Sequence, residues 1–81
     1  MHTDLSIELR IDEDETNTLV FAELDLRGDH FEATGRARRN PIDRPMPVVG
    51  EELAVARALG ALALEVMEAA QHKIERFLEP A

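Results

Sequence analysis

Three runs of alternating apolar and polar residues fill the first half of the chain. The first is DLSIELRID, the second TLVFAELDL and the third HFEATGRAR, and each has apolar side chains at every second position. Successive side chains of a strand point to opposite faces, so each run predicts a strand with one apolar face. We expect these strands at about residues 4–12, 18–27 and 30–38.

Short connections predict that the strands form an antiparallel meander. A two-residue Gly-Asp turn at 28–29 suits a hairpin between the second and third strands. This turn places Leu26 opposite Phe31 and puts the apolar residues of both strands on one side of the sheet. A shift of the register by one residue would put the apolar residues of the two strands on opposite sides of the sheet. The pattern therefore determines which residues form the apolar face.

The connection between the first two strands is the acidic stretch DEDETN. A four-residue loop at 13–16 would pair Ile11 with Thr18 and keep the apolar sides together. From Asp12, oxygen-bearing side chains at every second position resemble the start of a calcium-binding loop, but Asn17 stands where that loop needs glycine and Glu23 falls in a strand. A solvated hairpin loop is the better interpretation.

The second half of the chain predicts one long helix after a proline-rich connection. Prolines favour extended neighbours, so we expect a loop over 40–50. Gly50 is an acceptable N-cap, and Glu51 and Glu52 would complement the helix dipole. Nothing then stops a helix before Pro80, which predicts a helix at about 51–78. The whole chain, 1–81, is therefore expected to be one α+β domain of the order β-β-β-α.

The expected helix is longer and more apolar than the sheet can cover. A 28-residue helix spans about 42 Å, whereas a nine-residue strand spans about 30 Å. The stretch LAVARALGALAL has Arg57 as its only charge, which is typical of a helix buried on more than one side. This predicts a homodimer whose helices, or exchanged helices, cover one another; a monomer with exposed alanines is the alternative. The expected interface residues are Leu53, Val55, Leu59, Leu62 and Val66.

Composition narrows the classes of partner. The 81-residue chain has 17 acidic and 9 basic side chains and a net charge of −8, and only the segment 27–50 carries a net positive charge. An acidic surface repels phosphate backbones, so we expect no DNA partner. The chain lacks cysteine and shows no signal peptide or membrane-spanning run. These features predict a soluble cytoplasmic protein without a membrane partner.

The positive segment is the main candidate binding site. Arginine suits phosphate or carboxylate groups because its planar fork donates paired hydrogen bonds. Arg36 would also lie opposite Phe21 and diagonal to Glu23, so a solvated charged sheet face explains part of the segment equally well. The candidate binding residues are Arg36, Arg38, Arg39, Asn40 and Arg44.

The chain shows no pattern of a catalytic or metal site. His2, His30 and His72 share no ligand spacing, and Ser6 is the one serine. Tryptophan and tyrosine are absent, which removes stacking platforms for single-stranded bases. We expect a protein that is not an enzyme and that needs no cofactor or metal.

The stretch GRARRNPIDRPMPVVGEELAVARALGALA resembles a family of short actinobacterial proteins of unknown function, whose fold is similar to the double-stranded-RNA-binding domain. The resemblance implies a β-β-β-α unit that forms an intertwined dimer. It also implies a role in stress or dormancy, because some relatives are associated with hypoxic arrest and their dimer is similar to ribosome hibernation-promoting factors.

Two functional hypotheses follow. The first is a non-enzymatic homodimer that binds an unidentified protein partner during stress. The second is a ribosome- or RNA-associated factor that uses the segment from Arg36 to Arg44. The chain departs from RNA-binding domains of this fold, since it lacks their N-terminal helix and their helix-start lysines and carries an acidic first loop. These departures favour the first hypothesis.

Overall fold

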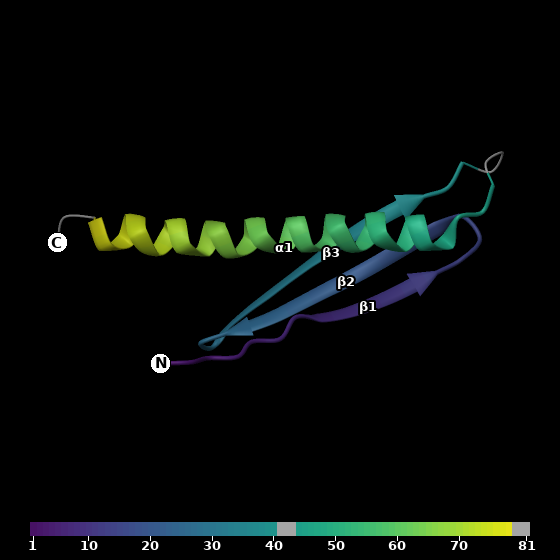
Figure 1. Cartoon of the computed structure of the whole chain (residues 1–81). Helices are drawn as coiled ribbons and strands as arrows, with labels where there is room; N and C mark the ends of the chain where they lie inside the picture. Colours follow the sequence, from purple (N-terminus) through teal and green to yellow (C-terminus); the bar gives the residue numbers. More distant parts are fainter. Residues whose placement is uncertain (41–43, 79–81) are drawn as a thin grey trace.

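The computed structural model describes residues 1–40 and 44–78 and shows a three-stranded sheet beneath one long helix (Figure 1). The order β1-β2-β3 is antiparallel throughout, and the helix follows the third strand. The predicted α+β meander with a C-terminal helix is confirmed. The elements are β1 (Glu8–Glu13), β2 (Asn17–Leu26), β3 (Asp29–Arg38) and α1 (Pro47–Leu78).

The β2–β3 hairpin turns one residue earlier than predicted. Arg27 and Gly28 have φ values of 52° and 88°, and Leu26 pairs with Asp29 rather than with Phe31. Positive φ at both central residues gives the twist that a two-residue hairpin needs, and glycine supplies it without strain. The predicted register was therefore wrong by two residues. A shift of two preserves the side-chain period, so the apolar faces still coincide.

The β1–β2 turn is also tighter than predicted. The Asp14 carboxylate accepts hydrogen bonds from the N–H groups of Thr16 at 2.9 Å and Asn17 at 2.7 Å. These bonds hold the pKa of Asp14 below its ordinary value. The turn aligns Ile11 with Val20, so the predicted pairing of Ile11 with Thr18 was wrong. β1 begins only at Glu8, and the predicted start at residue 4 was too early.

The helix begins at Pro47, three residues before the predicted cap at Gly50. The Gly50 N–H donates to the Met46 carbonyl at 3.1 Å, which closes the first helical turn. Proline is well suited to the first helical position, because its missing N–H would have no partner there. The first turn consequently holds no acidic side chain, and the prediction that Glu51 and Glu52 occupy it was wrong. Residues 41–43 of the predicted loop lie outside the described residues.

A small core joins the helix to β2 and β3. Its buried apolar residues are Val20, Ala22, Ala37, Ala54, Ala58 and Leu62. Four of these six are alanines, so the two layers meet at short range. The closest approach is at Gly35, where a Cβ atom would overlap the Ala54 carbonyl oxygen and the Ala58 backbone nitrogen. This glycine is required by backbone contact, since it lies in a regular strand.

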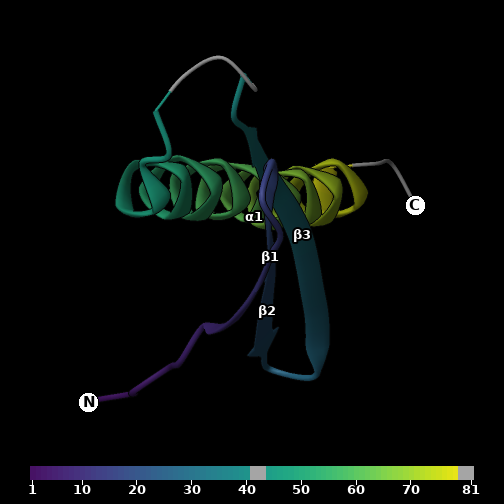
Figure 2. The same cartoon turned by 90° about the vertical axis from the view of Figure 1, so that its right-hand side faces the viewer.

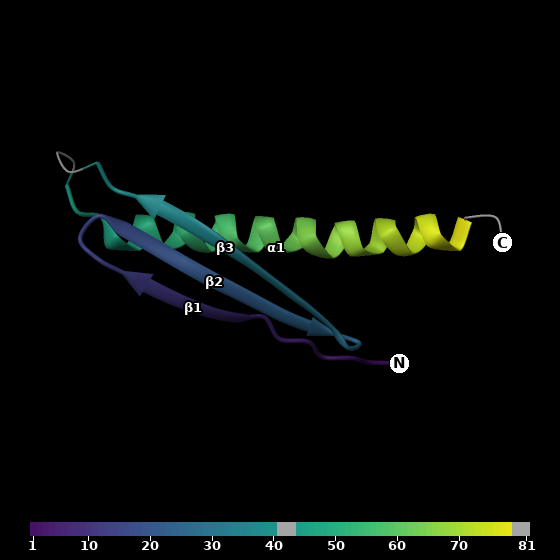
Figure 3. The same cartoon turned by 180° about the vertical axis from the view of Figure 1, so that it is seen from behind.

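The helix leaves β1 largely uncovered. It runs obliquely along β3 and β2, while β1 is the strand farthest from it (Figures 1 and 3). Leu9 and Ile11 share the sheet face of buried Ala22 and Val20, yet they are 39% and 42% exposed. The helix and the sheet also diverge toward the β2–β3 turn (Figures 1 and 2).

The single chain exposes more surface than its mass requires. Its accessible surface is 6808 Å², whereas a compact 9.1 kDa monomer exposes about 4,900 Å². The radius of gyration is 16.7 Å, against about 12 Å for a compact chain of this length. No helix among the described residues is long and apolar enough to cross a membrane.

Replacing Gly35 by alanine is expected to destabilise the fold strongly. The added methyl group meets the backbone of α1, which cannot move without separating the two layers. We expect a loss of about 3 kcal/mol in the free energy of unfolding, measured by urea denaturation. Thr34→Ala, at the exposed neighbouring position, is the matched control; equal stability of the two variants would contradict the close packing at Gly35.

Candidate functional site

A pocket of about 420 Å³ lies where the β1–β2 turn, the end of β3 and the start of α1 meet. Its apolar side is formed by Ala37, Val49 and Leu53, and its polar side by the turn and by arginines. A pocket of this size can accept a small ligand or a few side chains of a partner.

The structure gathers four of the five predicted binding residues at this pocket. Arg38, Arg39, Asn40 and Arg44 all line it. Arg39 is held to the β1–β2 turn, since its backbone N–H donates to the Thr16 carbonyl at 2.8 Å and its Nε to the Glu15 carbonyl at 3.2 Å. This arginine therefore joins the end of β3 to the turn.

Arg36 lies apart from the pocket, on the sheet face that points away from the helix. It pairs with Leu19, not with Phe21 as predicted, because of the two-residue change of register. Arg10, and not Arg36, lies over the Phe21 ring, with its guanidinium carbon 4.5 Å from the ring centre. The backbone carbonyl of Arg36 accepts a hydrogen bond from Arg57 at 2.7 Å, which ties β3 to the helix.

Acidic residues offset the arginines around the pocket. Glu13, Asp14 and Glu15 line it together with the three arginines, so the charges nearly balance. The Glu13 side chain also forms a hydrogen bond with the Glu51 side chain of the helix. This hydrogen bond raises the pKa of Glu13. A balanced pocket with an apolar side suits an amphipathic protein segment better than a polyanion.

A second polar cluster occupies the outer sheet face near the β2–β3 turn. The register places Glu8, Glu23 and Glu32 in one row across the three strands. Like charges directly opposite one another on a sheet are unfavourable. His30 lies in the next row, opposite Asp25, and supplies a group that can carry positive charge.

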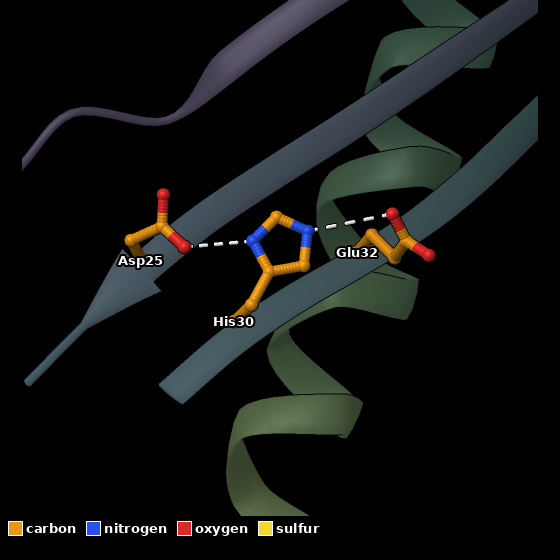
Figure 4. A network of polar contacts seen from close by, with 3 residues as sticks. All are labelled: Asp25, His30 and Glu32. Atoms are coloured by element: carbon orange, nitrogen blue, oxygen red, sulfur yellow. Dashed lines mark hydrogen bonds and ion pairs between the residues drawn. The ribbon is translucent and has the colours of Figure 1, made fainter. Parts of the chain in front are cut away.

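His30 bridges two carboxylates in this cluster (Figure 4). Its Nδ1 lies 2.7 Å from Asp25 and its Nε2 lies 3.4 Å from Glu32. Both ring nitrogens face acceptors, so the doubly protonated ring satisfies the geometry best. The hydrogen bond to Asp25, followed by that to Glu32, raises the pKa of His30.

The same cluster contains the side chains best arranged for a metal among the described residues. Ligand atoms of Glu23, His30 and Glu32 lie within 4.8 Å of one another, and all three residues are exposed. A metal would need an unprotonated His30 nitrogen, whereas the two carboxylate contacts favour the histidinium form. The arrangement therefore fits an ionic network more closely than a metal centre. The sequence pattern did not predict this cluster, because the alignment of the glutamates across the strands depends on the strand register.

The predicted dimer-interface residues divide between two faces of the helix. Leu62 is 2% exposed in the core of its own chain, and Val55 packs against that core. Val66 is half-buried, while Leu53 and Leu59 are exposed. The helix therefore uses part of the predicted set for its own sheet.

Comparison with known proteins gives relatives without described activity. The profile of the Rv2632c-like family matches residues 3–81. Over 70 residues the chain is 40% identical to the uncharacterized protein Mb1767 of Mycobacterium bovis, covering 86% of this chain and 74% of that protein. It is 36% identical over 69 residues to the uncharacterized protein Rv2632c of Mycobacterium tuberculosis, covering 85% and 74%. A crystal structure of Rv2632c superimposes with a TM-score of 0.91 and 31% identity, covering 100% of this chain and 96% of that one.

The His30 network is expected to depend on pH in a definite direction. Because its pKa is raised in the folded state, His30 stabilises the fold fully below about pH 6.5, the unfolded value, and this contribution is lost as the pH rises through the folded pKa. NMR titration of the imidazole should show a raised pKa that falls toward the ordinary value in Asp25→Asn. An unchanged pKa in that variant would mean that Asp25 does not hold the ring.

Proposed function

We propose that this chain, which belongs to the Rv2632c-like family, acts as a homodimer that binds a protein partner and catalyses no reaction. The observation that carries the proposal is the surplus of about 1,900 Å² of accessible surface over a compact monomer. A standard interface buries about 800 Å² on each partner. The surplus is large enough for a dimer contact and a second interface.

The described side chains support a binding role rather than catalysis. His2 and Ser6 precede β1 and are exposed, whereas His30 lies in β3 and His72 in α1. The printed sequence has no thiol, and the ring nitrogens of His30 contact the carboxylates of Asp25 and Glu32 and not a hydroxyl group. No group in this set activates another for acyl or phosphoryl transfer.

β1 offers a surface that fits an extended protein segment. Leu9 and Ile11 expose apolar side chains on the helix side of the sheet, and β1 is an edge strand with one free side. A partner strand could pair with this edge and cover both side chains, as in β-strand addition. The nearby acidic residues would favour a partner segment that carries lysine or arginine.

A ribosome-associated role through Arg36 to Arg44 is the weaker alternative. The arginines are interleaved with Asp12, Glu13 and Asp14, which line the same surface as Arg36 and Arg38. A phosphate backbone would meet these carboxylates as well as the guanidinium groups.

We further propose that the protein acts during growth arrest. This part of the proposal is supported by the resemblance of the stretch from Gly35 to Ala63 to proteins associated with hypoxic arrest. The test is to measure the abundance of the protein when oxygen is withdrawn from growing cells. Constant abundance through the arrest would contradict this role.

The dimer is expected to appear directly in solution mass. Light scattering of the purified chain at micromolar concentration should give about twice 9.1 kDa. A single-chain mass under these conditions would refute the dimer and with it the main part of the proposed function.

The ribosome alternative predicts a different result. If it holds, the protein sediments with ribosomes at low salt, and a variant with Arg36, Arg38, Arg39 and Arg44 changed to glutamate does not. We expect no sedimentation of the unaltered chain, because the acids beside these arginines offset them. Salt-sensitive sedimentation that depends on the arginines would establish the alternative instead.

A further inference from the structure

The pocket at the start of the helix carries charges of both signs on one side and apolar side chains on the other. The acids of the β1–β2 turn and the arginines form the polar side, and Ala37, Val49 and Leu53 form the apolar side. A ligand that matches this division has both charges at one end and an apolar group at the other. The use that the fold makes of each side decides which groups such a ligand can reach.

Two of the three arginines at the pocket can receive an anionic group. Arg39 is used by the fold, because its Nε donates to the Glu15 carbonyl at 3.2 Å. Among residues 1–40 and 44–78, no ion pair involves Arg38 or Arg44. A guanidinium group offers a planar pair of donors that matches a carboxylate. Arg38 and Arg44 therefore form the part of the pocket that suits a ligand carboxylate.

The β1–β2 turn supplies the matching group for a cation. The Oδ1 atom of Asp14 accepts the two backbone hydrogen bonds of the turn and a third from the Thr16 hydroxyl at 3.3 Å. These bonds hold the carboxylate in place, and its Oδ2 atom takes no part in them. The neighbouring Glu15 carboxylate enters no ion pair within the part of the chain that the structure describes. The two acids therefore suit an ammonium group, which donates three hydrogen bonds.

The apolar side of the pocket is open and is stiffened by proline. Val49 and Leu53 lie four residues apart on one face of the helix and are 46% and 45% exposed. Met46, which also lines the pocket, is 57% exposed. Pro45 and Pro47 flank Met46, and their fixed φ angles restrict the backbone there. An aliphatic group on this wall would cover apolar surface that the single chain leaves in water.

We propose that the pocket binds an α-amino acid with an aliphatic side chain, either free or as a short peptide. The ligand carboxylate faces Arg38 and Arg44, its ammonium group faces the two acids of the turn, and its side chain covers the helix wall. A ligand with one charge would satisfy half of the polar side and leave the other half without a partner. The volume of about 420 Å³ lies near the lower end for ligand pockets, which also favours a small molecule.

Titration of the isotope-labelled protein with L-leucine, followed by NMR, tests this inference directly. We expect saturable shifts of the backbone amide signals of Arg38, Val49 and Leu53. N-acetyl-leucine lacks the ammonium charge and leucinamide lacks the carboxylate, so each should bind about tenfold more weakly than L-leucine. A parallel titration with leucyl-leucine distinguishes a short peptide from a free amino acid.

Exposed positions on the polar side provide matched variants. Glu15→Gln should weaken the binding of L-leucine about tenfold and leave that of N-acetyl-leucine unchanged, because this compound has no ammonium group. Arg44→Gln should weaken the binding of L-leucine to a similar extent and leave that of leucinamide unchanged. Arg76→Gln, exposed near the end of α1, is the control and should bind L-leucine as the unaltered chain does. Circular dichroism checks that each variant is folded.

Each outcome decides a part of the inference. No saturable shift with L-leucine or leucyl-leucine up to about 20 mM would overturn the site. Equal binding of L-leucine, N-acetyl-leucine and leucinamide would overturn the recognition of both charges. Saturation by leucyl-leucine alone would support the site and assign it to short peptides. Equal weakening in Arg76→Gln would overturn its placement at this pocket.

The inference is independent of the proposed homodimer and protein partner. All residues of the pocket belong to one chain. A single-chain mass by light scattering would therefore refute the homodimer and leave the ligand site standing, whereas failure of L-leucine and leucyl-leucine to bind would leave the homodimer standing.

Discussion

The contact between Gly35 and the helix backbone is the constraint on which the rest of the structure depends. Because position 35 has no side chain, the turn of helix from Ala54 to Ala58 lies directly on β3. The other core residues are small as well, so two thin layers meet at short range. A core of this kind buries little apolar surface and contributes correspondingly little stability.

The position of the helix over β3 decides which surfaces remain open. A helix centred on β3 and β2 cannot also cover β1, so Leu9 and Ile11 stay exposed although they belong to the inner face. The same placement leaves the apolar side chains of Met67 and Ile74 in the helix exposed to solvent. The two open apolar surfaces therefore have one cause, and a protein with so small a core gains stability when partners cover them.

The two polar clusters also arise from contacts between strands. Arg39 contacts the β1–β2 turn because the meander brings the end of β3 beside it. His30 is surrounded by acids because the register aligns one row of side chains across the strands. The first arrangement leaves the pocket with balanced charges, and the second gives the sheet a histidine whose pKa is raised by hydrogen bonds to Asp25 and Glu32.

The sequence by itself determined the elements and their faces. The alternation in each strand set the inner face, and a register wrong by two residues left that face unchanged because the side-chain period is two. It also predicted a helix with more apolar surface than a single small sheet can cover. It did not locate the start of the helix, because Pro47 reads equally well as a loop residue or as a first helical residue. Only the tertiary structure decided the cross-strand row around His30, the gathering of Arg38, Arg39 and Arg44 at one pocket, and the helix face that stays open. Each of these three features depends on the strand register or on the close approach at Gly35. The local hydrophobic pattern specifies neither the register nor that approach.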